Sequence, residues 1–410
     1  MSSAPAILCC STAFLPADSH GGLPYSTFYL CRALQRAGAD VRVVTTDRNG
    51  TRRLDVPRDC WTTFDSLPVW YATTSSGPFL YGTSAKAAID QALGAVDCVI
   101  NSGTLWVHSG WLTWRAAKQR RIPAVDYPRG LLQPWAFEFK PVRKQLYWQL
   151  IGRRILRDSA AVVALTEFEA ARLRELNVNQ RIEVIPNGAA LESNDPRPTR
   201  AWLGDRYPAL SGRRYVLFLG RIHEIKGIDV LLGAAAALVK RNAELAFVVA
   251  GPVEPTYEAR WRELLAFYEL EGKLILTGPV KGPEKVAWLE HATVFVLPSY
   301  SEGQPVAALE ALQAGCPVVI SRACHLPEVE RAGAGLTIEP TVDALVASIE
   351  ALLNDESRRC LMSKRARDLA TNTFDWSAIG RRTLELCRAV VAQRRGAPRE
   401  TKSRSILTNS

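Results

Sequence analysis

Two glutamates, Glu302 and Glu310, have the residue type and spacing that best suit chemistry on a polar substrate. Residues 298 to 321 read PSYSEGQPVAALEALQAGCPVVIS, and an apolar strand precedes this string. Pro305 suits the first position of a helix, and Gly315 suits the position after its last turn. The string therefore predicts one helix, with Glu302 in the loop before it and Glu310 within it.

The start of this helix is a candidate phosphate site. Free N–H groups and the positive end of the helix dipole attract anions there. Pro305 has no N–H, so Val306 and Ala307 are the candidate donors. Carboxylates would not bind the phosphate itself, but they could accept hydrogen bonds from the hydroxyls of a sugar attached to it. The structural alternative is that Glu302 only caps the helix and Glu310 lies on its solvated face.

Two cations occupy the segment Gly220-Arg-Ile-His-Glu-Ile-Lys-Gly227, which follows one predicted strand and precedes a helix. The guanidinium fork of Arg221 and the point charge of Lys226 could together neutralise a diphosphate. The alternative is a charged surface loop without a ligand.

A glycine pair, Gly21 and Gly22, follows the first predicted strand. Glycines at this position let the backbone approach a ligand closely. The pattern is not G-x-G-x-x-G, so it gives little support to a dinucleotide fold of the dehydrogenase type. The alternative is a plain tight turn.

Short apolar runs alternate with helical patterns along the chain and supply the strands that must position these motifs. This alternation predicts parallel, doubly wound sheets. Such sheets bind ligands at the carboxyl ends of their strands, where all three motifs fall. The predicted strands are Ala6–Cys10, Val41–Thr45, Asp97–Ile100, Pro123–Asp126, Ala160–Ala164, Ile182–Ile185, Tyr215–Leu219, Leu245–Ala250, Leu274–Leu276, Val294–Leu297 and Pro317–Ile320.

In this order and at these strand ends, the motifs resemble the retaining family-4 glycosyltransferases of the GT-B fold. The most specific match is the E-x7-E element inside the string S-E-G-x-P-x-x-x-L-E-A-x-x-x-G-x-P-V-V. The resemblance covers nearly the whole chain, through Ile185-Pro-Asn-Gly188 to Phe374-Asp-Trp376. It implies an α/β fold in which two Rossmann-like domains face each other across a cleft and a C-terminal helix crosses back to the first domain.

Four segments follow from this reading. An acceptor-side domain is expected at residues 1–190 and a nucleotide-sugar-binding domain at residues 191–375. A crossover helix is expected at residues 376–395, and a basic, flexible tail at residues 396–410. The stretch from Glu192 to Gly212, rich in proline, aspartate and arginine, is taken as the linker between the domains.

The resemblance also implies a role for each motif residue. The donor would be a nucleoside-diphosphate sugar, and no cofactor or metal is expected, in line with the absence of a D-x-D triplet. Glu302 would bind the sugar hydroxyls, Glu310 the ribose hydroxyls, Arg221 and Lys226 the diphosphate with Gly21 and Gly22 close to it, and Val280 would lie near the base.

The chain departs from its relatives at one position. Many relatives carry a histidine near the donor sugar, after the strand that here ends at Asp126. Arg129 is nearest that place, and His108 is a second candidate in the cleft. Either is a candidate catalytic residue, and a buried structural role for His108 stays open. The string PRGLLQPW from residue 128 resembles a subgroup associated with bacterial polysaccharide assembly.

The net charge of +10 is spread unevenly. Residues 115–157 carry eleven Lys/Arg against two Asp/Glu, and the last thirty residues carry eight against two. Between Lys140 and Arg157 the cations alternate with apolar residues, among them Trp148, at helical spacing. This pattern suits a peripheral contact with an anionic membrane, or a helix packed on the sheet with a solvated basic face. No nucleic-acid motif accompanies the charge, so nucleic acid is not expected as a partner.

Nine cysteines without a C-x-x-C pair, and five histidines without an H-x-x-x-H pair, argue against disulfides and metal sites. Most cysteines are expected in the core. No apolar run is long enough to span a bilayer, and the start of the chain lacks the positive charge of a secretory signal. A cytoplasmic protein is therefore expected.

The expected activity is retaining transfer of a sugar to a hydroxyl of a glycan or lipid-linked glycan. Two alternatives remain from the sequence. A sugar-nucleotide epimerase of the GT-B type would act on the donor alone, and a non-catalytic protein would bind the nucleotide sugar without turnover.

Overall fold

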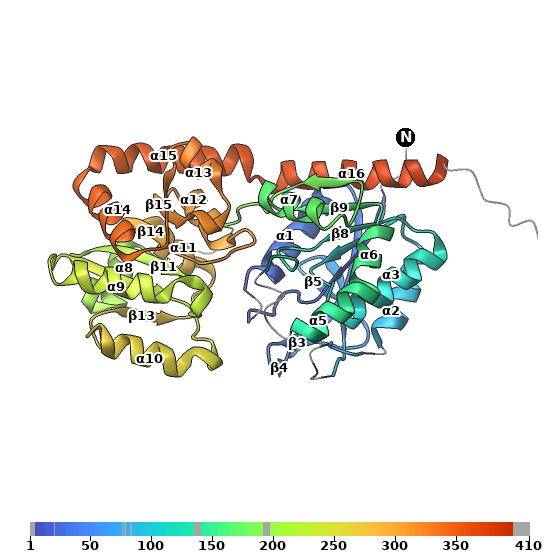
Figure 1. The fold of residues 1–410 in the computed structure, drawn as a ribbon, viewed down its shortest axis with the longest axis horizontal. Coiled ribbons are helices and arrows are strands. Elements are labelled where there is room, and N and C mark those ends of the chain that lie inside the picture. Colours follow the sequence, from blue (N-terminus) through green and yellow to red (C-terminus); the bar gives the residue numbers. More distant parts are fainter. Residues whose placement is uncertain are drawn as a thin grey trace, which may run out of the picture.

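The computed structural model describes residues 5–19, 21–75, 77, 79–82, 84–134, 141–191 and 197–396. His20, Lys140, part of the predicted linker and residues 397–410 of the predicted tail lie outside these ranges. The described chain forms two lobes side by side, each a sheet covered by helices, with α15 and α16 running along the top of both (Figure 1).

In the described residues of the first lobe, eight strands form one sheet in the order β10-β9-β8-β7-β1-β2-β6-β5, parallel except for β5. Its central strands are buried, which explains their apolar runs. The strands are β1 Ala6–Ser11, β2 Asp40–Thr46, β5 Trp61–Phe64, β6 Leu67–Ala72, β7 Cys98–Ser102, β8 Ala124–Tyr127, β9 Ala161–Ala164 and β10 Ile182–Val184. The helices are α1 Leu23–Arg36, α2 Ser84–Ala92, α3 His108–Arg120, α5 Pro141–Tyr147, α6 Arg153–Asp158 and α7 Glu167–Glu175. A small hairpin, β3 Arg48–Asn49 and β4 Arg52–Arg53, stands apart from the sheet.

The second lobe, as described, has six parallel strands in the order β13-β12-β11-β14-β15-β16. They are β11 Arg214–Leu219, β12 Leu245–Ala250, β13 Ile275–Gly278, β14 Val294–Leu297, β15 Val318–Ser321 and β16 Gly335–Ile338. The helices are α8 Arg200–Arg206, α9 Ile228–Val239, α10 Glu258–Phe267, α11 Gly282–His291, α12 Val306–Ala314, α13 Pro327–Arg331, α14 Val342–Asn354 and α15 Glu356–Thr373.

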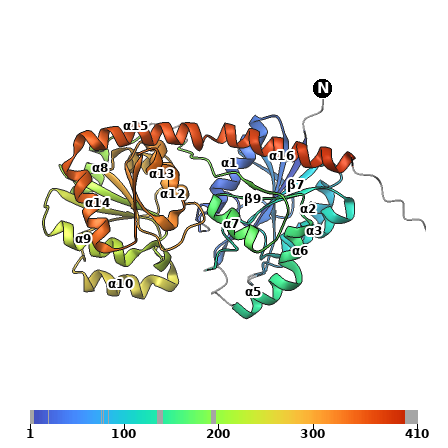
Figure 2. The same cartoon turned by 45° about the horizontal axis from the view of Figure 1, so that its top comes forward.

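The last helix, α16 (Trp376–Gly396), lies on the first lobe, as expected for the crossover helix (Figure 2). Its Gly380 lies so close to α1 that a Cβ there would be 2.7 Å from the backbone of Ala33. The ring of Trp376 stacks on that of Tyr29, with centroids 6.0 Å apart. The predicted GT-B architecture, with two Rossmann-like sheets and a returning helix, is confirmed.

Several details differ from the sequence predictions. Pro305 has an extended conformation and precedes α12 as its cap, so the helix begins one residue later than expected. The sequence prediction also missed β5 and β16, because partly exposed or short strands lack a long apolar run. It missed β6 as well, although Leu67–Ala72 is an apolar run of six residues. Seven of the nine described cysteines are buried and all nine are free, as expected of core residues.

Trp148 does not point outward, as the membrane alternative would require. A π-helical turn, Trp148–Gly152, joins α5 to α6 and turns this side chain inward. The ring is 7% exposed and packs in a cluster with Leu105 and Leu156. Burial of this large aromatic side chain in the core is favourable. The periodicity of the segment does not reveal that the ring points inward.

An aspartate in the first sheet makes the stability of the fold depend on pH. Asp126 on β8 is buried, and the hydroxyl of Ser159 donates to its Oδ2 at 2.6 Å. Burial raises the pKa of Asp126 to about 6. The native state therefore holds this proton more tightly than the unfolded chain, whose aspartates titrate at about 3.9. The free energy of unfolding should fall as pH rises from about 4 to 6.

Asp126→Asn removes this penalty. At pH 7.5 we expect the free energy of unfolding to rise by up to about 3 kcal/mol, whereas at pH 4 it should match that of the parent protein. Urea unfolding at both pH values measures the difference. The exposed Asp205→Asn on α8 is the control, expected to change stability by less than about 0.5 kcal/mol. An equal effect of Asp126→Asn at both pH values would contradict this account.

Candidate functional site

The carboxyl ends of the two sheets meet where the domains touch. A Cβ on Gly22 would lie 2.7 Å from the side chain of Val306, so only glycine permits this approach. A Cβ on Gly130 would lie 3.2 Å from Gly303 of the loop before α12. Close by, the backbone N–H of Asn187 donates to the side-chain oxygen of Gln304 at 2.6 Å. The Gly21–Gly22 turn and the start of α12 therefore face each other, as the sequence motifs predict.

Lys226 and Glu302 form one ion pair at the end of the second sheet. The ammonium of Lys226 lies 2.6 Å from Oε1 of Glu302, and the hydroxyl of Ser299 donates to the same oxygen at 2.7 Å. The Glu302 side chain is 9% exposed and that of Lys226 is 20% exposed. The residue at the cap position of α12 is Pro305, and Glu302 binds Lys226 and Ser299, so the alternative that Glu302 serves only as a helix cap is wrong.

The loop that carries Lys226 is held by a glycine. Gly227 has φ +65°, and a Cβ there would lie 2.0 Å from the carbonyl oxygen of Pro298, just after β14. The loop after β11 is thereby pressed against the loop after β14, which brings Lys226 to Glu302. Arg221 begins the same loop, but its Nη1 pairs with Glu254 at 2.8 Å. Arg221 Nε is buried and has no hydrogen-bond partner in the structure as described.

Glu310 is buried, so the alternative of a solvated face is also wrong. Its Oε1 accepts from the ammonium of Lys285 on α11 at 2.7 Å, and its side chain is 6% exposed. The same ammonium lies 5.4 Å from the ring centroid of Tyr25, on α1 of the first domain. Lys285 thus joins the second carboxylate of the E-x7-E element to the first domain. Val280, also buried, lies in the loop between β13 and α11.

The first turn of α12 offers backbone donors. Ala308 and Leu309 donate to the carbonyl oxygen of Pro305, as in any first turn. The N–H groups of Val306 and Ala307 have no backbone acceptor among the described residues, which is the usual condition at a helix start. They remain available to an anion facing Gly22.

Arg129 lies at the junction of the two domains. Its Nε donates to the hydroxyl of Ser102 at 2.7 Å, and its Nη1 donates to Ser26 at 3.0 Å and to Asn187 at 2.7 Å. No carboxylate of the described chain forms an ion pair with it. The nearby buried Glu169 accepts instead from the backbone N–H groups of Gly130 and Leu165. Burial lowers the pKa of Arg129, and its φ of +55° is unusual for a residue with a side chain.

His108 lies elsewhere on the same edge of the first sheet. It is 8% exposed and is surrounded by the rings of Phe79, Tyr81 and Trp111. Burial lowers its pKa, so the ring is neutral at neutral pH. The structure therefore brings Arg129, and not His108, to the loop of Glu302.

Comparisons with known proteins indicate what kind of protein carries this site. Residues 21–188 match the family model of the glycosyl transferase 4-like domain, and residues 205–369 match that of the glycosyl transferases of group 1. The chain belongs to the family-4 glycosyltransferases. The first matched segment contains every strand of the first sheet except β1, and the second contains all six strands of the second sheet.

Among similar proteins is the D-inositol 3-phosphate glycosyltransferase of Pseudarthrobacter chlorophenolicus, 34% identical over 58% of each chain. A putative colanic acid biosynthesis glycosyltransferase of Escherichia coli is 28% identical over 58% of this chain and 59% of its own. The matches thus span less than two thirds of these relatives. A structure of the Anabaena protein HepE with UDP-glucose superposes with a TM-score of 0.73 at 17% identity, over 94% of this chain and all of its own. At that identity the likeness shows only that the two proteins share the GT-B fold.

Sequence reasoning missed several residues of the site. Ser299 and Gln304 stand inside the motif string and could have been noticed there. Lys285 and Glu254 could not, because they reach Glu310 and Arg221 from other helices and loops. No described group of three or more His, Cys, Asp or Glu side chains is arranged to hold a metal ion.

The Lys285–Glu310 pair should stabilise the second domain. Lys285→Met leaves a buried carboxylate without its cation, and we expect the free energy of unfolding to fall by about 3 kcal/mol. Glu310→Gln in that background should restore most of the loss, since no buried charge remains. Urea unfolding of the two single variants and the double variant gives the coupling energy.

The exposed pair of Lys86 and Asp90 on α2 provides the control. Lys86→Met should cost less than about 1 kcal/mol, because water screens exposed pairs. If Lys285→Met costs no more than Lys86→Met, the buried pair has no structural role.

Proposed function

We propose that this protein transfers a sugar, with retention of configuration, from a nucleoside-diphosphate sugar to a hydroxyl of a glycan or lipid-linked glycan. The observation that carries the proposal is the Lys226–Glu302 pair in the loops after β11 and β14, together with the contact of Gly22 with Val306 at the start of α12. Membership of the glycosyltransferase family and the likeness to HepE, a protein solved with UDP-glucose, support it. The colanic acid relative supports a role in surface polysaccharide synthesis.

When the donor binds, its groups would replace the partners that the side chains of the site have in this structure. Its diphosphate would bind to the free N–H groups of Val306 and Ala307, beside Gly22, with Lys226 and Arg221 as counter-charges. The hydroxyls of the sugar would bind to Glu302 and those of the ribose to Glu310. Lys285 would hold the carboxylate of Glu310 in place, and the base would lie near Val280.

The main task of the site in this reaction is to stabilise the negative charge that develops on the leaving diphosphate. The bond from the anomeric carbon to the diphosphate oxygen breaks, and the acceptor oxygen bonds to that carbon on the same face. The proton of the acceptor hydroxyl passes to the departing diphosphate. Cations fixed in a partly buried site stabilise the departing charge without reorganising. Lys226 and Arg221 would do so from the second domain, and Arg129 from the first. These fixed cations make a resident metal unnecessary in this proposal.

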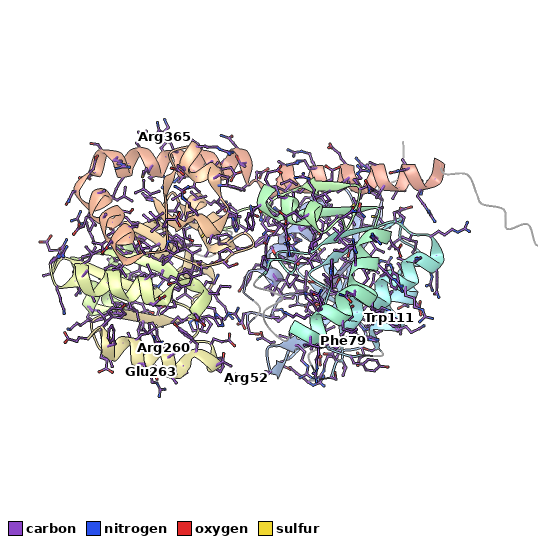
Figure 3. All side chains as sticks on the ribbon, in the orientation of Figure 1. Arg52, Phe79, Trp111, Arg260, Glu263 and Arg365 are labelled. Carbon is purple, nitrogen blue, oxygen red and sulfur yellow. The ribbon has the colours of Figure 1, made fainter. Side chains whose placement is uncertain are left out.

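Loss of one cation should therefore slow the reaction strongly. Arg221→Ala or Lys226→Ala should lower turnover at least about 100-fold, the scale found when one preorganised donor is removed. Product formation from labelled sugar nucleotides, without added acceptor and with glycan acceptors, measures turnover. Arg260→Ala on α10, an exposed arginine labelled in Figure 3, is the control and should keep parental turnover.

The same assay separates the alternatives. Transfer or slow hydrolysis of the donor supports the glycosyltransferase, and isomerisation of the donor would indicate the epimerase. Binding without turnover would indicate a nucleotide-sugar sensor. Near-parental turnover in both the Arg221 and the Lys226 variants would refute the assigned roles.

We also propose a peripheral contact with anionic membrane through α5 and the π-helical turn that follows it. Val142, Leu146 and Leu150 follow one another at helical spacing and are 80%, 57% and 54% exposed. Exposed cations flank them, among them Arg143 and Arg154. Basic and apolar residues on one exposed face suit the membrane interface. No helix of the described chain is both long and apolar enough to cross a bilayer.

Binding to vesicles should depend on this face. Each cation near an anionic surface contributes about 1 kcal/mol, so Arg143→Glu with Lys144→Glu should weaken binding at least about 10-fold. Leu146→Ser with Leu150→Ser should weaken it as well. Sedimentation with phosphatidylglycerol and phosphatidylcholine vesicles at low and high salt measures both effects.

Two controls complete this test. Leu361→Ser on α15, also an exposed leucine, should leave binding unchanged. A truncation after Gln393 measures the separate contribution of the basic C-terminal segment. If the intact protein does not sediment with anionic vesicles at low salt, the membrane proposal is wrong.

A further inference from the structure

Five rings gather on the first domain beside the proposed reaction centre and are here called the aromatic cluster. Tyr81 lies 4.4 Å from His108 between ring centroids, and Trp111 stacks on His108 at 5.7 Å. Phe79 lies 5.8 Å from His108 and 5.6 Å from Tyr147. Figure 3 labels Phe79 and Trp111 on the lower part of this domain, below and beside α5. The proposed reaction does not use these rings.

Topology places the cluster at the edge of the sheet where the donor would bind. Phe79 and Tyr81 follow β6, His108 and Trp111 follow β7, and Tyr147 ends the helix that follows β8. These are carboxyl ends of parallel strands, the edge that carries ligands in such sheets.

A short, fixed path joins the cluster to Arg129. Ser102, which accepts from Arg129, is six residues before His108, and an extended chain of six residues reaches at most about 20 Å. The indole N–H of Trp106 donates to the carbonyl oxygen of Leu131 at 3.3 Å, which ties the loop after β7 to the loop of Arg129. An acceptor of two or three sugar rings could span this distance.

The cluster has features that a packed core does not need. Tyr81 is 55% exposed although its ring lies against a buried histidine. Nδ1 of His108 accepts from the backbone N–H of Gly82, so the ring proton is on Nε2, for which the described residues provide no acceptor. The hydroxyl of Tyr147 is buried and also has no partner in the described structure. Ring surface and spare hydrogen-bonding capacity thus occur together.

We infer that the aromatic cluster is the binding subsite for the acceptor glycan, in which a pyranose ring lies against Tyr81 and Trp111. The apolar C–H face of a pyranose matches an aromatic face, and its hydroxyls can accept from Nε2 of His108. The inference rests on the proposed function, because it is the acceptor that a transferase must hold beside its donor. The rings would position the glycan so that its terminal hydroxyl reaches the donor near Arg129.

A binding experiment without donor tests this subsite separately from catalysis. The probe is octyl β-glucoside below its micelle concentration, and saturation-transfer NMR records which of its protons contact the protein. We expect strong transfer to the sugar C–H protons, and at least about 5-fold weaker binding in Tyr81→Ala and Trp111→Ala. Trp111→Phe should bind nearly as the parent, because it keeps a ring. An octyl ether of tetraethylene glycol, which has no sugar, should not displace the probe.

Two exposed aromatic residues outside the cluster serve as controls. Phe267→Ala on α10 should have no effect. Phe168 stacks on His325 at 3.7 Å beside a cavity of about 760 Å3 between the domains, which is the competing place for a glycan. The inference is overturned if Phe168→Ala, and not Tyr81→Ala, weakens binding, if the sugar-free ether displaces the probe, or if the tail protons alone receive saturation.

Activity gives the second readout. In the Tyr81 and Trp111 variants, hydrolysis of the donor without acceptor should stay parental, while the KM for a glycan acceptor rises. If the parent protein shows neither transfer nor donor hydrolysis, the proposed function fails while the NMR result still decides the subsite. If hydrolysis falls together with transfer in these variants, the cluster supports the donor site instead, and the inference is wrong.

Discussion

Charges in the region between the domains are held by partners because an ion removed from water is costly to leave alone. Lys226 with Glu302, and Lys285 with Glu310, satisfy this constraint within the second domain. Both pairs depend on backbone geometry, since Gly227 lets one loop press on Pro298 and α11 lies against α12. The same groups that stabilise the fold without a ligand are those that a diphosphate, a sugar and a ribose could engage. Ligand groups would then replace existing ion-pair and hydrogen-bond partners, and no unpaired charge would wait in an open pocket.

Arg129 is the exception to this constraint. Three neutral oxygens hold its guanidinium, and no described carboxylate balances it. A cation fixed in this way favours an anion at the junction of the domains, and the positive φ of its backbone shows that the surrounding contacts outweigh a local conformational cost. The neighbouring His108 has the opposite character, because the rings around it keep it neutral. Charge and aromatic surface thus divide one edge of the first sheet into two parts with different chemistry.

The position of the domains relative to each other rests on contacts that tolerate few changes. At Gly22, Gly130 and Gly380 another segment lies so close that an added Cβ would crowd its backbone or side chains. The ring of Trp376 covers Gly188 and stacks on Tyr29, which seats α16 on α1. Two parallel sheets that each fold locally are thereby brought to one site by a helix from the end of the chain.

Periodicity and local motif chemistry were sufficient for much of this protein. Apolar runs gave most strands of both sheets, because strands buried on both faces need continuous apolar residues. The E-x7-E string and its flanking proline and glycine gave α12 and the two carboxylates, because capping and turn preferences act over a few residues. Strands with exposed faces, such as β5 and β16, lacked that signal.

Only the tertiary structure decided which side chains meet. The burial of Trp148, the pairing of Glu310 with Lys285 and of Arg221 with Glu254, and the separation of Arg129 from His108 all depend on contacts between elements far apart in the chain. Local sequence specifies the type of an element and its apolar face, whereas the partner of a charge is set by whichever element packs against it. The sequence by itself therefore determined the family, the sheets and the motif residues, and the packing of the two domains decided how those residues are partnered.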